Sequence, residues 1–362
     1  MSLVNPVLRP QVCEGRITLT SALPVPKTDQ TAKTTVYFSP YGGNRIALFN
    51  GVSWKTRTFA EASVAVPATL NRIFDIFGYD NNGTFTLEAV NWNQSTGTIT
   101  AATAAAQSVV TSTGHGLSNG NLVFINGIVG TLGTSTNNGL NGKLWKVEAV
   151  AANTFECDGS DTTGLTYTSG GTWYTVPNTR VTALTTQDNV YVKTGELTKR
   201  YLGTLMTTAT SGECEDSRER RLVWNYYNRV SREFYKIEAA VSWTYSSTAV
   251  RPMNNSTANR LGFVIGVAEE LWWGDAHGKF STTVDANGSV HISANNVADY
   301  ITISLPTHTV VNAGQYGNIR ERVFYNPDAG YYAMQAVETG FGAGTQTFYG
   351  ESSVGISGYI FG

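Results

Sequence analysis

Apolar and polar residues alternate with a period of two along most of this 362-residue chain, and turn residues separate the alternating runs. Two such runs, rich in Val, Ile, Thr and aromatic residues, span 34–59 and 72–92. Because successive side chains of a β-strand point to opposite faces, this period predicts half-buried strands. Asn50-Gly51 and Asn82-Gly83 lie between apolar runs and tolerate the positive φ angles of tight hairpin turns. The pattern therefore predicts an all-β protein.

One segment, from about 99 to 173, differs from the rest because it is rich in Ala, Thr, Gly and Asn and dense in turn signals. The earlier strand pattern resumes after it. We therefore predict an insertion into a hairpin of the first domain, between Gln94 and Val176, since surface hairpin tips tolerate insertions best. The insert is predicted to be a small β-barrel with a core of its own, formed by the aromatic residues Phe124, Trp145, Phe155, Tyr167 and Trp173.

The predicted domain division follows from this insertion. It comprises a discontinuous N-terminal β domain of residues 1–93 and 177–212, the inserted barrel 94–176, a helix and junction 213–230, and a C-terminal sandwich 231–362. The sandwich domains are expected to be jelly-roll-like. One short helix is predicted from Asp216 to Val223, because Asp216 can cap a helix and pair with Arg220 at the i, i+4 spacing.

The charge content argues against two classes of partner. Charged residues make up 14% of the chain, and 25 basic and 27 acidic side chains leave a net charge of -2. Such a chain has no broad positive field for nucleic acid. No run of about 18 apolar residues and no leader pattern is present, so we expect a soluble protein made in the host cytoplasm without membrane insertion.

The residues that carry chemistry are scattered, which predicts a protein with no catalytic site, metal site or cofactor. Cys13, Cys157 and Cys214 are far apart and predict buried thiols, although an exposed one could pair between subunits. The four histidines form no metal-binding spacing. The segment "GYDNNGT" imitates part of a calcium loop but lacks its closing acidic residue, so it predicts a hairpin turn.

The pair Glu269-Glu270 is the strongest catalytic candidate, because glycosidases use two carboxylates. Neighbours on a strand point to opposite faces, so these two cannot bracket one glycosidic bond. The adjacent Trp272 and Trp273 could stack on sugar rings, which keeps a glycan-binding hypothesis open. On a strand, however, one of the two would face the core and the other would pack against a neighbour.

The segment "WNYYNRV", residues 224–230, combines large aromatic residues with Asn and Arg. Trp, Tyr and Arg anchor the buried centres of protein interfaces. Its arginines have acidic neighbours, which argues against nucleic acid, and no base or nucleophile accompanies them. The segment therefore predicts a domain junction or subunit interface, formed by the side chains of Trp224, Tyr226, Tyr227 and Arg229.

Several segments together resemble a family of tailed-bacteriophage virion proteins described as tail-fibre or minor structural proteins. They are "RITLTSALPVP", "FDIFGYDNNGTFTLEAVNW", "QDNVYVKTGELTKRYLGTL", "RRLVWNYYNRV" and "FYGESSVGISGYIFG". The insert separately resembles small β-barrel modules of phage tail proteins, through a His-Gly-Leu turn at residues 115–117 and Asn-Thr-Phe at 153–155.

This resemblance implies a structural role in a virion, as a fibre, spike or decoration protein attached to tail or head, and gives no catalytic residues to carry over. It implies contacts with other virion proteins and a trimer. Composition independently predicts a homo-oligomer, because a chain with few charges and many β edges exposes sticky surfaces as a monomer. The alternative is a carbohydrate-binding module of the particle that recognises a host-surface glycan.

Overall fold

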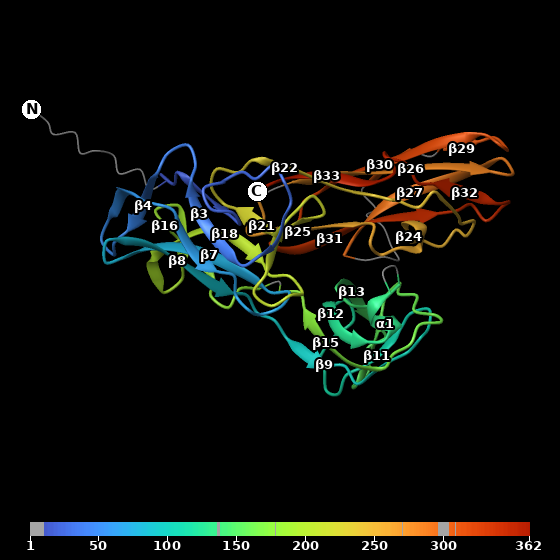
Figure 1. Cartoon of the computed structure of the whole chain (residues 1–362), viewed down its shortest axis with the longest axis horizontal. Coiled ribbons are helices and arrows are strands. Elements are labelled where there is room, and N and C mark those ends of the chain that lie inside the picture. The colour runs from blue at the N-terminus through green and yellow to red at the C-terminus, as the bar shows by residue number, and fades with distance from the viewer. Residues whose placement is uncertain (1–10, 136–137, 178, 270, 296–303, 308) are drawn as a thin grey trace, which may run out of the picture.

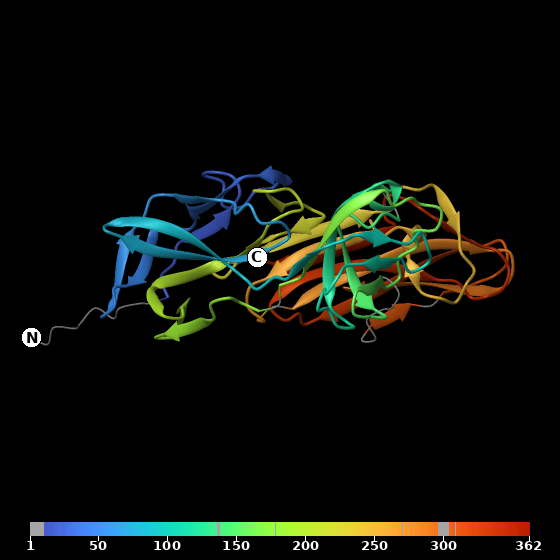
Figure 2. The same ribbon diagram turned by 90° about the horizontal axis from the view of Figure 1, so that it is seen from below.

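The computed structural model describes residues 11–135, 138–177, 179–269, 271–295, 304–307 and 309–362. Figure 1 shows an elongated molecule with an N-terminal body at one end, a two-sheet sandwich at the other and the insert beside the sandwich. The view from below in Figure 2 shows the insert lying across one side of the sandwich. The fold is all-β, as the alternation predicted.

The N-terminal body consists of antiparallel strands from both sides of the insert. Its main sheet has the order β16-β17-β18-β7-β8, with a further strand, β21 (Val223–Asn225), paired to β18. The five strands are β7 (Ile73–Asn81), β8 (Thr84–Asn91), β16 (Leu184–Gln187), β17 (Val190–Lys193) and β18 (Glu196–Met206). A three-stranded sheet and a hairpin complete the body: β1 (Gly15–Thr18), β3 (Thr35–Pro40) and β6 (Ala62–Ala65), then β4 (Arg45–Phe49) and β5 (Trp54–Thr58).

Both predicted Asn-Gly hairpins are confirmed. Asn50-Gly51 joins β4 to β5, and Gly51 has a φ of +92°. Asn82-Gly83 joins β7 to β8 with φ angles of +50° and +95°, and the Asp80 carboxylate accepts a hydrogen bond of 2.7 Å from the Gly83 amide. The "GYDNNGT" segment is therefore a hairpin turn.

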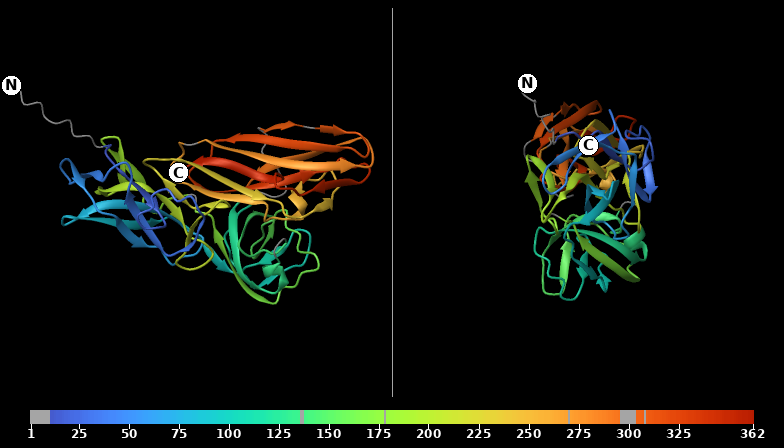
Figure 3. Two further views of the ribbon diagram at one scale, coloured as in Figure 1. Left: turned by 45° about the horizontal axis from the view of Figure 1, so that its top comes forward. Right: turned by 90° about the vertical axis from the view of Figure 1, so that its left-hand side faces the viewer.

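The insert is a curled seven-stranded sheet, with the order β10-β11-β14-β13-β12-β15-β9, and a one-turn helix. Figure 3 shows it as a compact unit from two further sides. The elements are β9 (Thr96–Thr98), β10 (Ala101–Ala102), β11 (Val109–Thr111), β12 (Leu122–Val129), α1 (Thr131–Thr134), β13 (Lys143–Glu148), β14 (Thr154–Cys157) and β15 (Ser169–Thr175).

The insert has a core separate from that of the other two bodies. Trp145, Phe155 and Trp173 lie in it, and Tyr167 packs against it. The prediction is wrong for Phe124, which belongs to the main core and packs on Tyr331 of the sandwich with ring centroids 5.2 Å apart. Phe124 therefore attaches the insert to the sandwich.

The sandwich consists of two facing sheets. The first has the order β2-β19-β20-β25-β31-β27-β29, with β24 beside β31. Its strands are β2 (Gln30–Lys33), β19 (Cys214–Asp216), β20 (Arg220–Arg221), β24 (Arg251–Pro252), β25 (Arg260–Ile265), β27 (Ala286–Ala294), β29 (Thr309–Val311) and β31 (Gly330–Thr339). Three of these strands precede residue 231, so the predicted sandwich of 231–362 lacks part of its own sheet.

The second sheet has the order β22-β33-β26-β30-β28, and β23 and β32 extend it beside β26. Its strands are β22 (Ser231–Ile237), β23 (Ser242–Thr244), β26 (Trp272–Thr282), β28 (Ser304–Thr307), β30 (Tyr316–Tyr325), β32 (Gln346–Tyr349) and β33 (Gly355–Phe361). A short 3₁₀ turn, Met253–Asn255, precedes β25. The apolar side chains between the sheets form one continuous cluster with the core of the N-terminal body.

The predicted helix from Asp216 to Val223 is wrong, because this segment is a hairpin. Asp216 is paired with Arg221 across it, and the Ser217 amide donates to the Arg220 carbonyl at 2.8 Å. Leu222 and Trp224 are both buried, which is the period of a strand. The Asp216 carboxylate accepts hydrogen bonds from Arg221 at 3.0 Å and from Arg232 at 2.8 Å, whereas Arg220 pairs with Glu215. The charges thus pair across strands and not along a helix.

Glu338 of β31 is a fully buried carboxylate within the sandwich. It accepts hydrogen bonds of 2.8 Å from both Arg251 and the Trp243 indole. Burial raises the pKa of Glu338 to about 7 even though Arg251 lowers it. Because this value lies above that of an exposed glutamate, the folded chain binds the proton more tightly than the unfolded chain does.

Glu338→Gln should therefore change how stability depends on pH. The stabilisation from proton binding is fully present below the ordinary glutamate pKa and is lost as the pH rises through about 7. Urea unfolding of both proteins between pH 5 and pH 8 should show the wild type losing up to about 3 kcal/mol relative to the variant. A constant difference across this range would contradict the prediction.

Candidate functional site

The "WNYYNRV" segment lies inside the single chain, at the junction of the N-terminal body and the sandwich. Trp224 of β21 is 1% exposed, and Tyr226 and Tyr227 are half-buried with their rings 4.8 Å apart. The Trp224 ring also lies against Gly266, where a Cβ atom would overlap it and the Tyr201 hydroxyl. Trp224 therefore has no exposed surface to offer a second subunit.

The two asparagines of the segment bind backbone of the strand β1. Asn225 accepts a hydrogen bond of 2.6 Å from the Ile17 amide and donates one of 3.1 Å to the Ile17 carbonyl. Asn228 donates to the carbonyls of Cys13 and Gly15 at 2.7 and 3.0 Å. These amides replace the hydrogen bonds that a neighbouring strand would supply.

Two arginines complete the junction. The Arg200 guanidinium lies 4.4 Å from the centre of the Tyr227 ring and donates to the carbonyls of Val12 and Ala47. Arg229 lies over the Trp224 and Tyr226 rings at 5.2 and 5.5 Å. The four residues predicted to form an interface therefore lie close together.

The structure separates the two tryptophans predicted to contact a glycan. Trp272 is buried and stacks on Phe263 with ring centroids 6.0 Å apart. Trp273 points to the outer face of the second sheet, where it stacks on Tyr359 at 4.8 Å and lies 5.4 Å from the Arg322 guanidinium. Only Trp273 of this pair is placed to contact a ligand.

Charged residues surround Trp273 on this outer face. Asp275 accepts hydrogen bonds of 2.7 to 3.2 Å from Arg320 and Arg322 of the neighbouring strand β30. Burial raises the pKa of Asp275, but the two arginines outweigh burial and hold it below its usual range. The carboxylate is therefore ionised and holds both guanidinium groups beside the aromatic stack.

The carboxylate pair suggested as a catalytic candidate does not form a site. Glu269 pairs with Arg229 at 3.1 Å, and Glu270 lies outside the described residues. Among the residues that the structure describes, no three His, Cys, Asp or Glu side chains are grouped to hold a metal ion. In the same residues, no helix is long and apolar enough to cross a membrane.

The three cysteines are free and buried, as predicted. Burial raises the pKa of the Cys13 thiol to about 11, so this thiol stays protonated at neutral pH. The thiols of Cys157 and Cys214 are raised further by the same cause. None of them is placed to act as a nucleophile or to pair between subunits.

The histidine motif of the insert has a structural role. The Leu117 amide donates to His115 Nδ1 at 3.0 Å, and His115 Nε2 lies 2.9 Å from the Ala151 carbonyl oxygen. The Gly114 amide donates to the Asn153 side chain at 2.9 Å. The two parts of the motif therefore fasten one turn to the next. His277 and His291 lie on β26 and β27, and His308 lies outside the described residues.

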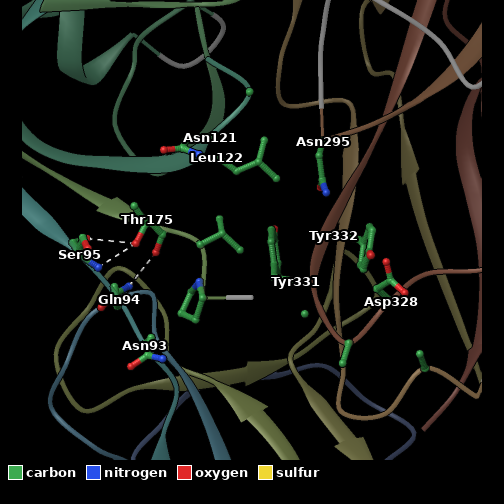
Figure 4. Close-up of a pocket in the computed structure, with 16 residues that line it drawn as sticks. Asn93, Gln94, Ser95, Asn121, Leu122, Thr175, Asn295, Asp328, Tyr331 and Tyr332 are labelled. Atoms are coloured by element: carbon green, nitrogen blue, oxygen red, sulfur yellow. Dashed lines mark hydrogen bonds between the residues drawn. The ribbon is translucent and has the colours of Figure 1, made fainter. Parts of the chain in front are cut away.

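A cleft of about 800 Å³ opens where the insert, the N-terminal body and the sandwich meet (Figure 4). Amide and hydroxyl groups dominate its lining, with two tyrosines on the side of the sandwich. The labelled residues are Asn93, Gln94, Ser95, Asn121, Leu122, Thr175, Asn295, Asp328, Tyr331 and Tyr332. Among the sixteen residues drawn, Asp328 alone has a charged side chain.

Several polar groups of the cleft already have partners. Gln94 donates to the Asn71 carbonyl at 2.8 Å, and Asn295 accepts from the Ala333 amide at 2.7 Å. Burial, followed by the charges of Tyr325 and Asp328, raises the pKa of the Tyr332 phenol, so it remains neutral. The cleft can therefore hold a neutral polar ligand, but its lining pairs no nucleophile with a base.

The sequence gave no signal for this cleft. Its residues come from positions 93–95, 120–122, 175–177, 268, 295 and 328–332, which only the tertiary fold brings together. Asn and Gln in turn-rich segments are common in any β protein, so their presence predicts turns and not a binding cleft. An unexplained gathering of tyrosines in "GYY" was the one local hint.

Comparisons with known proteins assign no family. No family model matches the chain, and no curated protein matches it. Among solved structures, a chain of infectious bursal disease virus strain Gx has a TM-score of 0.26 and 11% identity, covering 93% of this chain and 74% of that one. A chain of the Gt strain has a TM-score of 0.23 and 13% identity, covering 96% and 68%.

The insecticidal delta-endotoxin Cry8Ea1 of Bacillus thuringiensis also matches, with a TM-score of 0.20 and 8% identity. That match covers 91% of this chain and 49% of the toxin chain. TM-scores this low do not define a shared fold, so the matched structures assign neither a fold family nor a function.

Asn225→Leu should destabilise the whole junction. The substitution keeps a similar volume but leaves the buried amide and carbonyl of Ile17 without partners, which should cost about 2 to 4 kcal/mol. The measurement is the free energy of unfolding in urea. Asn81→Leu, at an exposed position of β7, is the control and should change stability by less than about 0.5 kcal/mol. Equal effects of the two substitutions would contradict the role of Asn225.

Proposed function

We propose that the chain is a structural protein of a tailed-bacteriophage particle, a fibre, spike or decoration protein attached to the tail or the head. The observation that carries the proposal is where the phage-like segments lie. "RITLT" forms β1, "RRLVWNYYNRV" contains β21, and the C-terminal "ISGYIFG" forms β33. These segments meet at the junction of the N-terminal body and the sandwich.

The contacts at this meeting point are architectural. Arg16 donates to the carbonyls of Asn228 and Gly362, the latter at 2.7 Å. The backbones of Val230 and Gly362 exchange two hydrogen bonds of 3.1 and 3.2 Å. The residues that carry the resemblance thus hold the molecule together, which supports a structural role and a protein without catalytic activity.

We also propose that the protein is a homo-oligomer, a trimer by the family resemblance. Apolar residues are exposed on the outer face and edge of the second sheet, where Tyr316, Phe324 and Phe361 are 63%, 50% and 46% exposed. Contact with another copy or another virion protein would cover them. Since Trp224 is buried within the chain, the sandwich is the better placed contact surface.

A cryo-EM map of the intact particle tests both statements. We expect density that fits this chain at the tail or on the head, arranged with three-fold symmetry. Mass spectrometry of purified particles gives the matching control, because a structural protein stays with the particle through purification. Absence of the chain from the particle would overturn the structural role, and a monomer in the map would overturn only the trimer.

A second candidate function, binding of a host-surface glycan, rests on the Trp273–Tyr359 stack. An exposed aromatic pair flanked by arginines offers a flat apolar surface with hydrogen-bond donors. Trp273→Ala should weaken binding of host polysaccharide by about tenfold or more, measured by biolayer interferometry. Tyr41→Ala, in the N-terminal body, is the control. Equal binding by both variants, or no binding by the wild type, would contradict this function.

A further inference from the structure

A separate pocket of about 220 Å³ lies beside the Phe124–Tyr331 contact that attaches the insert to the sandwich. The insert supplies one wall through Phe124 and the turn of residues 141–143. The hairpin of β19 and β20, together with β22 and β25, supplies the other walls. The pocket thus combines side chains from elements that are distant in the sequence.

The lining of this pocket is strongly basic, although the chain as a whole is slightly acidic. Four of its twelve residues are cationic and one is anionic: Lys143, Arg220, Lys236 and Arg260, with Glu219. Glu219 pairs with Lys236 at 2.7 Å, and Arg220 pairs with Glu215 at 3.2 Å. These carboxylates compensate the two cations of the hairpin side, so the pocket retains an excess of positive charge.

Lys143 and Arg260 lie close enough to repel each other. Lys143 is only 7% exposed, and burial followed by the charge of Arg260 lowers its pKa to about 7. Burial also lowers the pKa of Arg260, to which the charge of Arg220 contributes. The Arg260 guanidinium donates to the Gly142 carbonyl at 3.1 Å, which places it directly beside Lys143. Like charges held together in a pocket of low dielectric are costly unless an anion compensates them.

We propose that this pocket binds an oxyanion, a phosphate, sulfate or carboxylate group of a ligand, with Lys143 and Arg260 as the binding side chains. Charge-assisted hydrogen bonds from an ammonium and a guanidinium are the strongest that such a group can accept. Because Lys143 belongs to the insert and Arg260 to the sandwich, the bound anion would also fasten the two bodies together. The larger cleft, with no basic side chain among its sixteen described lining residues, does not suit the same ligand.

Isothermal titration calorimetry of the full-length chain with inorganic phosphate tests this site. We expect Lys143→Met and Arg260→Met each to weaken phosphate binding by about tenfold or more, since each removes one charge but keeps much of the side-chain volume. Lys279→Met is the matched control, because Lys279 lies on the exposed face of β26 and pairs with Glu351. Its affinity for phosphate should equal that of the wild type.

Two further comparisons define the ligand. Titrations with sulfate, glucuronate and glucose separate a tetrahedral oxyanion, a carboxylate and a neutral sugar, and glucose should not compete with phosphate. Lys143→Arg keeps the charge and should retain binding, which separates loss of charge from loss of folding if a Met variant is unstable. The proposal is overturned if chloride at matched ionic strength gives the same response as phosphate, or if the Met variants bind as the wild type does.

Discussion

The fold depends on two asparagine side chains that take the place of a missing strand. The backbone of β1 is buried beside "WNYYNRV", and Asn225 and Asn228 satisfy the carbonyls and amide that β1 presents there. Without them, the core that runs without a break from the N-terminal body into the sandwich would enclose unpaired backbone groups. The conformation of both bodies therefore depends on these amides, and the aromatic residues around them only fill the remaining space.

The insert stands outside this continuous core. Its own core is built on Trp145, Phe155 and Trp173, and its Phe124 contact with Tyr331 joins it to the sandwich. Both the neutral cleft and the basic pocket have Tyr331 in their lining. The position of one attached body thus creates two sites of opposite chemical character, and a ligand in either site would stabilise the attachment.

Sequence reasoning succeeded where the cause is local. The Asn-Gly turns, the opposite faces of Trp272 and Trp273, and the buried cysteines follow from φ angles, strand period and residue type. It failed for the segment after Asp216, because helical charge spacing and a charged hairpin look alike until Arg232 and Arg221 are seen to share that carboxylate. The two pockets could not be predicted either, since their residues meet only through contacts between distant segments.

The placement of charge gives the strongest physical reason to look for a ligand. At most buried positions, opposite charges meet: Arg180 pairs with Asp75 at 2.6 Å, and Arg251 pairs with Glu338 at 2.8 Å. Such pairs offset the cost of removing each charge from water. At Lys143 and Arg260 the neighbouring buried charges have the same sign, so this cost grows with their proximity. A protein with only 14% charged residues gains no stability from that arrangement alone, whereas an anion between the two would reverse the sign of the interaction.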